Sequence, residues 1–574
     1  MPVTPTYPGL YIEELPSSAH TITAAPTSIT VFVGYVSPFK TPAANVGVPV
    51  ELFSFSDFER EFGGAYESSL IDSNLASAVY QFFLNGGADA YVVGLLPTRY
   101  TDDRGDGSKK FGDTLNFGPA VAPSTIKIPN ASTPALIFTA LEPVDSVPMT
   151  VTISNPRTVT VTVTDPKTKA VTTPSVQAAD IVVSYGSLSE TYRKVNLVAN
   201  NPDFIETRIG VPGTLVSSLV TIGPPQGGYP SSYPFPMSPP TNTPPVLQAA
   251  TDLDRDLPKV GSPASPATGV FNATDFAPVF ATDGALDKLP IFNLMAIPGI
   301  VNFAVLSEAL AFCERKHAFL VMDPPIIDVA DGGDAKNNYV GRFIDQTGDS
   351  NGNIAPLSEN GALYFPFLKS FDPLGNQQQL PPSGFVTGVY ARTDQNRGVW
   401  KAPAGLETIV SNTTGVIDSG RMTDPRHGDL NGKGANCLRT FSTGTVVFGA
   451  RTLVGATDNT TFEQWRYVPV RRMALFIEQT LLRNLKWVIF EPNDQPLWTA
   501  ITNSINAFML SLFTQGAFQG SKPSEAFQVK CDSTTTTQTD IGNGVVNIVV
   551  AFAPLKPAEF VIIKIAQLAG QAQQ

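Results

Sequence analysis

The sequence predicts a multidomain α+β protein with an α/β core built from the N- and C-terminal parts of the chain, a β-rich inserted domain, and extended segments at both ends. Three observations predict this arrangement. Helical patterns alternate with short apolar runs near both ends of the chain. The run MTVTISNPRTVTVTVTD at 149–165 alternates as β-strands do. The 574 residues, 42% of them hydrophobic, suffice for several buried cores.

The composition excludes several functional classes. A net charge of −12 argues against nucleic acid as a main partner. The three cysteines, Cys313, Cys437 and Cys531, are far apart and imply no disulfide framework. The first residues, MPVTPTYPGLYIEE, do not have the pattern of a secretory signal, and no run reaches the roughly 20 apolar residues of a membrane span. We therefore expect a protein made in the cytoplasm without a signal peptide and without membrane insertion by this chain.

Two helices are predicted in the C-terminal part. The first, at about 470–485, places Met473, Ile477 and Leu481 on one stripe. The second begins near Pro496, a favourable residue for a first helical turn. The short run KWVIF between them (486–490) predicts a strand, because it is brief and rich in β-formers. Three further runs predict strands, at 527–530, 545–552 and 560–565.

The N-terminal part predicts alternating strands and helices. The run TSITVFVGY (27–35) predicts a buried strand, and a helix containing Leu75, Val79 and Phe82 ends at the Asn-Gly-Gly of 85–87. A nucleotide-binding βαβ unit is the competing interpretation, but no G-x-G-x-x-G joins strand to helix. The run GLYIEE at 9–14 alternates like a strand that has no local partner.

The middle of the chain changes character twice. Residues 99–285 predict short alternating strands, hence a β-sandwich-like insertion. Nine prolines lie between Gly223 and Val246, which predicts a linker or a long surface loop. Residues 286–435 return to an α/β pattern, with a helix in VLSEALAFCERKH and a buried strand in AFLVMDPP.

Motifs of catalysis and metal binding are incomplete. Cys313 and His317 stand four residues apart and could share a metal, although a pair on the core and rim of a helix is the commoner case. The run GDLNGKGAN (428–436) fails the P-loop pattern, because its spacing is one residue short and Gly434 replaces the Ser or Thr. Residues 349–360 lack the glycine and closing Glu of a calcium loop. The sequence therefore predicts no enzyme activity and no catalytic, metal or cofactor-binding residue.

Several motifs appear in a recognisable order. They are ALYFPFLKSFDP (362–373), NCLRTFSTGTVVFGARTLV (436–454), YVPVRR (467–472), FEPND (490–494) and PAEF (557–560). In this order and spacing, the chain resembles contractile tail sheath proteins, the outer sleeves of contractile phage tails, R-type pyocins and extracellular injection particles. The resemblance leaves 102–180 and 223–285 uncovered.

The resemblance implies a structural subunit that polymerises as stacked hexameric rings around an inner tube and contracts to drive the tube through a target envelope. The implied partners are other copies of the chain, the inner tube protein, and baseplate and terminal cap proteins. The implied location is a phage tail or phage tail-like extracellular particle, assembled from protein made in the bacterial cytoplasm. A non-contractile decoration protein or an adhesin-like β-rich structural protein is the alternative.

The resemblance and the composition together set the expected domain limits. The expected parts are an N-terminal extended arm (1–25), the N-terminal part of the sheath core (26–98), a β-rich inserted, outward-facing domain (99–285) with a Pro-rich loop (223–246), a middle α/β domain (286–435), a C-terminal α+β domain facing the inner tube (436–555) and a C-terminal arm strand (556–574).

The resemblance also suggests two groups of contact residues. Inter-subunit arm strands are expected at Tyr7, Gly9, Leu10, Tyr11, Ile12, Glu13, Glu14, Phe560, Val561, Ile562, Ile563, Lys564 and Ile565. Contacts to an acidic inner tube are expected from Arg471, Arg472, Arg483 and Lys486. Residues 460–574 hold nine basic and eight acidic side chains, so the acidic excess lies elsewhere in the chain. A solvated helix face is the alternative interpretation of these four cations.

Overall fold

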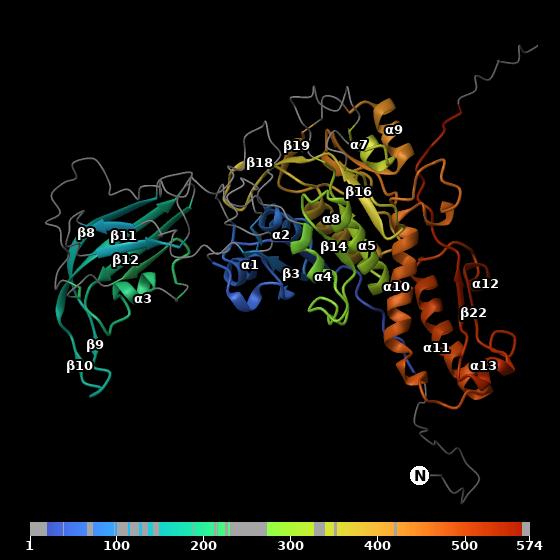
Figure 1. Ribbon diagram of the computed structural model, residues 1–574, viewed down its shortest axis with the longest axis horizontal. Coiled ribbons are helices and arrows are strands. Elements are labelled where there is room, and N and C mark those ends of the chain that lie inside the picture. The colour runs from blue at the N-terminus through green and yellow to red at the C-terminus, as the bar shows by residue number, and fades with distance from the viewer. Residues whose placement is uncertain are drawn as a thin grey trace, which may run out of the picture.

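The structure, a computed structural model, separates into an inserted β-domain, a central α/β part and a C-terminal helical part (Figure 1). It describes 20–37, 40–65, 73–96, 98–99, 113–114, 125–128, 136–141, 149–185, 188–211, 214, 216–223, 228–229, 273–325, 339–348, 353–417 and 422–564. The α+β class predicted from the sequence is confirmed. Among the described residues, no helix is both long and apolar enough to cross a membrane.

The central part is organised around an eight-stranded sheet. Its order is β2 (Val50–Leu52), β3 (Ala90–Leu95), β1 (Thr30–Tyr35), β14 (Leu294–Ala296), β15 (Phe319–Met322), β16 (Gly361–Phe365), β20 (Ala435–Phe441) and β21 (Gly444–Val447). The six strands from β3 to β20 are parallel, and the two edge strands are antiparallel to their neighbours. Such sheets are buried on both faces, which explains why these strands read as continuous apolar runs.

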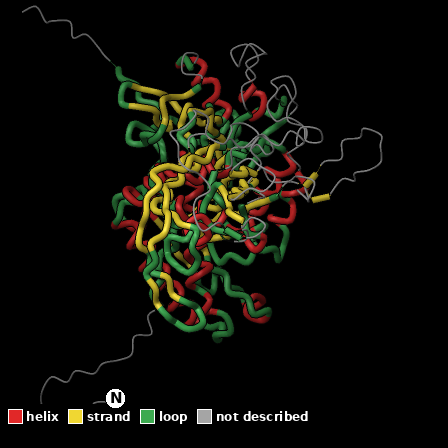
Figure 2. Tube along the Cα trace, turned by 90° about the vertical axis from the view of Figure 1, so that its left-hand side faces the viewer, coloured by secondary structure: helices red, strands yellow, loops and turns green. Residues whose placement is uncertain are grey.

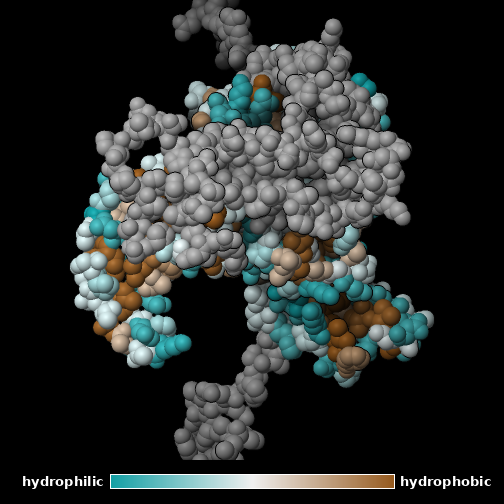
Figure 3. Space-filling model, turned by 60° about the vertical axis from the view of Figure 1, so that its left-hand side comes forward, coloured by the Kyte–Doolittle hydropathy of each residue, from teal (hydrophilic) through white to brown (hydrophobic). Residues whose placement is uncertain are grey.

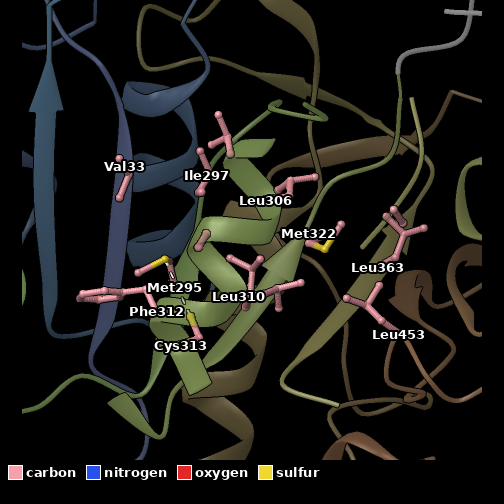
Figure 4. Packing of buried hydrophobic residues seen from close by; sticks show 14 of the residues in the cluster. Val33, Met295, Ile297, Leu306, Leu310, Phe312, Cys313, Met322, Leu363 and Leu453 are labelled. Carbon is pink, nitrogen blue, oxygen red and sulfur yellow. Dashed lines mark hydrogen bonds between the residues drawn. The ribbon is translucent and has the colours of Figure 1, made fainter. Parts of the chain in front are cut away.

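Alternate residues of the central strands feed two hydrophobic cores. Val31 and Val33 of β1 point to the face covered by α5 (Phe303–Lys316), together with Met295, Leu306 and Leu310 (Figure 4). Phe32, between the two valines, points to the opposite face and packs against α1 (Phe55–Phe62) and α2 (Leu75–Leu84). The two-residue period of a strand therefore attaches helices to both faces of the sheet.

Helices α2 and α8 (Ser383–Arg397) approach each other closely through two glycines. A Cβ at Gly384 would lie 2.5 Å from the backbone of Ala78, and one at Gly388 would lie 2.6 Å from the carbonyl oxygen of Phe82. Gln81 of α2 also donates a hydrogen bond to the carbonyl of Phe371 (2.9 Å). This contact joins the N-terminal part of the chain to its middle.

The inserted domain is a β-sandwich that projects as a lobe of its own (Figures 1 and 3). One sheet contains β8 (Thr150–Thr160), β11 (Ser175–Tyr185) and β12 (Leu188–Asn196). The other contains β6 (Thr125–Ile128), β7 (Leu136–Ala140) and β13 (Val220–Gly223). Both sheets contribute buried residues to one core, and α3 (Ile205–Ile209) adds to it. Figure 2 shows these strands from the side of the lobe.

Smaller elements complete the inserted domain and the edge of the central part. Two pairs of short strands are β4 (Thr98–Arg99) with β5 (Asp113–Thr114), and β9 (Val163–Thr164) with β10 (Val171–Thr172). Residues 273–285 were expected in the inserted domain, but α4 (Ala277–Phe280) contributes Val279 and Phe280 to the core of the central part. The inserted domain therefore ends before 273, because this short helix buries its apolar side chains against α5.

A second small sheet and two helices lie at the far edge of the central part. The sheet consists of β17 (Leu368–Phe371), β18 (Gln377–Leu380) and β19 (Thr413–Val416). The helices are α7 (Tyr339–Ile344) and α9 (Asp424–Lys433). Strands β20 and β21 were expected in the C-terminal domain, yet they pair within the central sheet. That domain consequently starts later than 436.

The C-terminal part contains the two predicted helices, α10 (Val468–Asn484) and α11 (Gln495–Thr514). The Asp494 carboxylate accepts a hydrogen bond from Leu497 N (3.2 Å) and caps α11, whose first turn contains Pro496. The predicted strand at KWVIF is wrong, since 486–488 form a 3₁₀ turn and Ile489 and Phe490 are exposed without a strand beside them. Beyond α11 lie α12 (Pro523–Ala526), β22 (Phe527–Lys530), α13 (Gln538–Gly542) and β23 (Val549–Phe552).

We predict that Gly388→Ala lowers the midpoint of thermal unfolding, because the added methyl group must displace the backbone of α2. Overpacking of this kind costs roughly 1–3 kcal/mol. Gly428→Ala is the matched control in α9, where nothing lies within 4 Å of the new Cβ. It should leave the midpoint unchanged or raise it. Equal effects of the two substitutions would contradict the close contact of α2 and α8.

Candidate functional site

The beginning of the described chain runs along α10, in the direction opposite to the helix (Figure 1). Thr23 N–H donates to Asn484 Oδ1 (3.0 Å), and Asn484 Nδ2 donates to Thr23 O (2.8 Å). Ala25 N–H donates to Thr480 Oγ1 (3.1 Å), one helical turn earlier on α10. The ring of His20 stacks on that of Trp487, with centroids 3.8 Å apart. The described chain therefore begins at the C-terminal end of α10.

The end of the described chain is attached by Glu559. Its carboxylate accepts hydrogen bonds from Arg451 Nε (2.8 Å) and Nη2 (2.6 Å), Asn431 Nδ2 (2.7 Å) and Tyr467 OH (3.2 Å). Only 3% of the Arg451 side chain is exposed. Burial raises the pKa of the Glu559 carboxyl, but the donors from Arg451 and Asn431 outweigh it, so the pKa lies below its ordinary value.

The residues after Glu559 are apolar and exposed. Phe560, Val561, Ile562 and Ile563 are between 74% and 82% exposed. Residues 560–564 form no strand within the described part of the chain, although the sequence predicted one. An apolar, β-rich segment attached at one fixed point and otherwise exposed is suited to pairing with another chain.

A two-stranded sheet precedes this segment in the chain. Strands β22 and β23 pair antiparallel, with Phe527 opposite Phe552 and Lys530 opposite Val549. Phe527, Val529, Val550 and Phe552 face the core of the C-terminal part, which α11 covers on this side. No described strand pairs with either outer edge. Isolated two-stranded sheets are marginally stable, and their free edges accept further strands.

The structure separates the four cations predicted to contact an inner tube. Arg483 and Lys486 are exposed at the end of α10. The Arg471 side chain is mostly buried; it donates to Asn360 Oδ1 (2.7 Å) and pairs with Glu478 (3.4 Å). Arg472 is 4% exposed and binds both carboxylate oxygens of Asp394, at 2.9 and 2.6 Å. This burial is incompatible with a surface contact from Arg472.

The arm residues fall partly outside the described chain. Tyr7, Gly9, Leu10, Tyr11, Ile12, Glu13 and Glu14 lie outside it, as does Ile565. The sequence analysis did not identify the residues that attach the C-terminal segment to the central part. Arg451 and Glu559 are charged residues inside the apolar motifs GARTL and PAEF, and that placement was the available signal for a buried ion pair.

Cys313 and His317 do not share a site. Cys313 is fully buried, with its Sγ 3.9 Å from Met295 Sδ, and His317 Nδ1 lies 2.7 Å from Glu478 Oε2. Within the described ranges, no group of three His, Cys, Asp or Glu side chains could hold a metal ion.

A protein-family comparison agrees with this geometry. Residues 460–567 match the phage tail sheath C-terminal domain. This part of the chain is therefore similar to a sheath C-terminal domain. It comprises α10, α11 and the β22–β23 sheet, and ends at the exposed segment after Glu559. The resemblance to contractile tail sheath proteins is thereby confirmed.

Two relatives share part of the chain. The tail sheath protein of Burkholderia phage BcepMu is 27% identical over 176 residues, which are 30% of this chain and 36% of the phage protein. The tail sheath protein of Salmonella phage ViI is 28% identical over 179 residues, which are 31% of this chain and 26% of the phage protein. The matches thus cover less than half of the relatives' own lengths.

Two solved structures share the fold over nearly the whole chain. The anti-feeding prophage helical sheath in its contracted state has a TM-score of 0.51 and 21% identity, covering 98% of this chain and 100% of that chain. The sheath complex of PVC, an extracellular contractile injection system, in the contracted state has a TM-score of 0.52 and 20% identity, covering 98% of both chains. At 20–21% sequence identity, this similarity shows a shared fold and nothing further.

We predict that Glu559→Gln releases the C-terminal segment while the central part stays folded. Leaving the buried Arg451 charge without its partner costs roughly 3 kcal/mol or more. The backbone NMR order parameters of residues 555–564 should fall, while the central part stays folded. Glu407→Gln removes a comparable pair with Arg397 on the surface and serves as the control, since both side chains are more than half exposed.

The contacts that attach the C-terminal segment through Glu559 should weaken in acid. Because the folded pKa of Glu559 is lowered, its contribution to stability is present at neutral pH and is lost as the pH falls through that folded value. The backbone order parameters of 555–564 should therefore fall below about pH 4, under the ordinary Glu pKa of about 4.3. Unchanged order parameters in both the variant and acid would contradict the role of Glu559.

Proposed function

We propose that this protein is the structural subunit of a contractile sheath, which polymerises as stacked hexameric rings around an inner tube and contracts to drive that tube through a target envelope. The observation that carries the proposal is the sheath C-terminal domain, with its unpaired β22–β23 edges and two attached chain ends. A decoration protein or an adhesin accounts for the inserted β-sandwich but not for this arrangement.

Strand addition between subunits supplies the links. An extended segment from one copy pairs with a free edge of β22 or β23 in another, and the exposed residues 560–563 cover apolar surface in the process. Each added backbone hydrogen bond contributes roughly 0.5–1.5 kcal/mol net. One strand is weak alone, but a lattice in which every copy gives and receives strands is held at many points.

Contraction in this proposal draws on energy stored during assembly. The sequence has no complete P-loop motif, and no G-x-G-x-x-G joins a predicted strand to a helix. The driving force is then a difference in free energy between two lattice arrangements, with interfaces that favour one of two states. Terminal segments that are each attached to their own subunit at one fixed point would allow the subunits to rotate while they remain linked.

The proposed partners are other copies of the chain, the inner tube, and the baseplate and terminal cap proteins of a phage tail or tail-like particle. The exposed cations Arg483 and Lys486 remain candidates for the inner-tube contact. Arg471 is a weaker one, because it lies near the start of α10 and pairs with Glu478. Arg472 is not among them, because its charge is already compensated by Asp394.

We predict that deletion of residues 1–19 yields a folded protein that does not polymerise. Negative-stain microscopy should show hollow cylinders for the full chain and none for the shortened one, with equal circular dichroism. Val561→Pro should act similarly at the other end, since proline removes a backbone donor from an added strand. Normal cylinders from both variants would overturn the strand-addition mechanism.

A second prediction concerns the tube. The double substitution Arg483→Glu with Lys486→Glu should give sheaths that form alone but do not retain the inner tube on co-expression, because an acidic tube would then face like charges. Replacing two exposed cations elsewhere, Lys167→Glu with Lys169→Glu in the inserted domain, is the control. If the first variant still retains the tube, the interpretation of these cations as a solvated helix face is the one that remains.

A further inference from the structure

One cavity of about 860 Å³ lies between the central part and the C-terminal segment. Its lining includes the aromatic side chains Trp400, Phe448, Tyr467 and Phe560, with Pro557. This volume falls in the range of about 300–1,000 Å³ that is typical of binding pockets. Aromatic walls of this kind usually enclose an apolar group of a partner.

Two cations at the cavity are not ion-paired within the described chain. Lys401 Nζ donates only to the carbonyls of Ala402 (3.0 Å) and Ala404 (3.4 Å), and Lys556 lies in the exposed C-terminal segment. The other charged lining residues, Arg397, Asp424 and Glu559, already have partners of opposite sign. The cavity therefore favours an apolar group accompanied by a negative charge.

The chain itself presents such a group on the loop between α10 and α11. Phe490 is 102% exposed, the highest value for a large hydrophobic residue in the described chain, and Ile489 beside it is 62% exposed. Phe490 also has a φ of 73°, in the left-handed region that is unfavourable for a bulky side chain. The next residue, Glu491, is exposed and has no ion pair among the described residues.

The loop is held in place on both sides. Trp498 Nε1 donates to Asn493 Oδ1 (2.8 Å), Asn493 Nδ2 donates to Val545 O (3.0 Å), and Asp494 caps α11. Phe490 is thus displayed by a fixed backbone rather than by a loose one. A strained, fixed and fully exposed aromatic residue indicates a contact that the isolated chain does not contain.

The cavity and Phe490 lie at opposite ends of α10. Tyr467 and Pro469, at the start of α10, line the cavity, whereas Phe490 follows the end of that helix. Helix α11 returns from this loop to Gln515 and Gly516, which line the cavity again. The 17 residues of α10 span about 25 Å, so Phe490 cannot reach the cavity of its own chain.

We propose that Phe490 and Ile489 of one copy insert into this cavity of a second copy, with Glu491 meeting Lys401 and Lys556. The proposal rests on the self-assembly proposed above and names an additional contact within it. A protrusion at one end and a recess at the other make a head-to-tail interface, which generates rings or open helical stacks rather than closed two-fold dimers.

Cross-linking between copies tests the contact directly. We place cysteines at Pro492, two residues after Phe490, and at Leu555, in the cavity wall, and use a short bismaleimide on the full chain. The three natural cysteines are buried and leave little background. The pair Pro492→Cys with Leu555→Cys should give ladders of linked copies. The pair Phe53→Cys with Leu555→Cys, with its first cysteine on the central part, should not.

Two further substitutions make the test specific. Phe490→Ser in the cross-linkable chain should lower ladder yield about tenfold or more, which corresponds to about 1.4 kcal/mol. Glu491→Lys should also lower it, and adding Lys401→Glu with Lys556→Glu should restore it. An unchanged ladder with Phe490→Ser, or no ladder at all, would overturn the proposal.

Microscopy of the same samples separates the two proposals. Cylinders combined with a cross-linked ladder that does not depend on Phe490 would support the sheath proposal and contradict the insertion of Phe490. A ladder that is lost with Phe490→Ser, in samples that form no cylinders, would support the insertion of Phe490 and contradict the contractile sheath proposal.

Discussion

The arrangement of this chain depends on one buried ion pair, between Arg472 of α10 and Asp394 of α8. The same guanidinium donates to the carbonyl of Thr27 (2.9 Å) and lies over the ring of Tyr390 (4.8 Å). It thereby connects the N-terminal segment, the central sheet with its helices, and the sheath C-terminal domain. Neither charge could remain buried without the other, so the pair fixes how α10 sits on the central part.

Local elements could be predicted from the sequence where one physical signal dominated. The spacing of Met473 and Ile477 predicts the buried face of α10, and Pro496 marks the first turn of α11. The strand predicted at KWVIF failed because β propensity expresses packing against neighbouring strands, and 486–490 have none. The order of the central sheet was not predictable, because its strands come from segments as distant as 30–35 and 444–447.

The candidate site was harder to predict than the fold. Arg471, Arg472 and Arg483 look alike in the sequence, and only Asp394, 78 residues from Arg472, distinguishes the buried cation from the exposed one. The attachment of Thr23 to Asn484 joins residues 461 positions apart. Contacts between a backbone and a distant side chain leave no periodicity in the sequence, so motif order identified the family without locating these points.

The N-terminal segment has a further property that follows from its direction along α10. Its bonds through Thr23, Ala25 and Thr27 are spread along the helix axis. A pull on the chain ahead of His20 parallel to that axis would load these bonds together in shear, and they would have to break at once. A pull at right angles would open them one after another, as in a zipper. The attachment is therefore mechanically anisotropic, strongest along the length of the C-terminal domain.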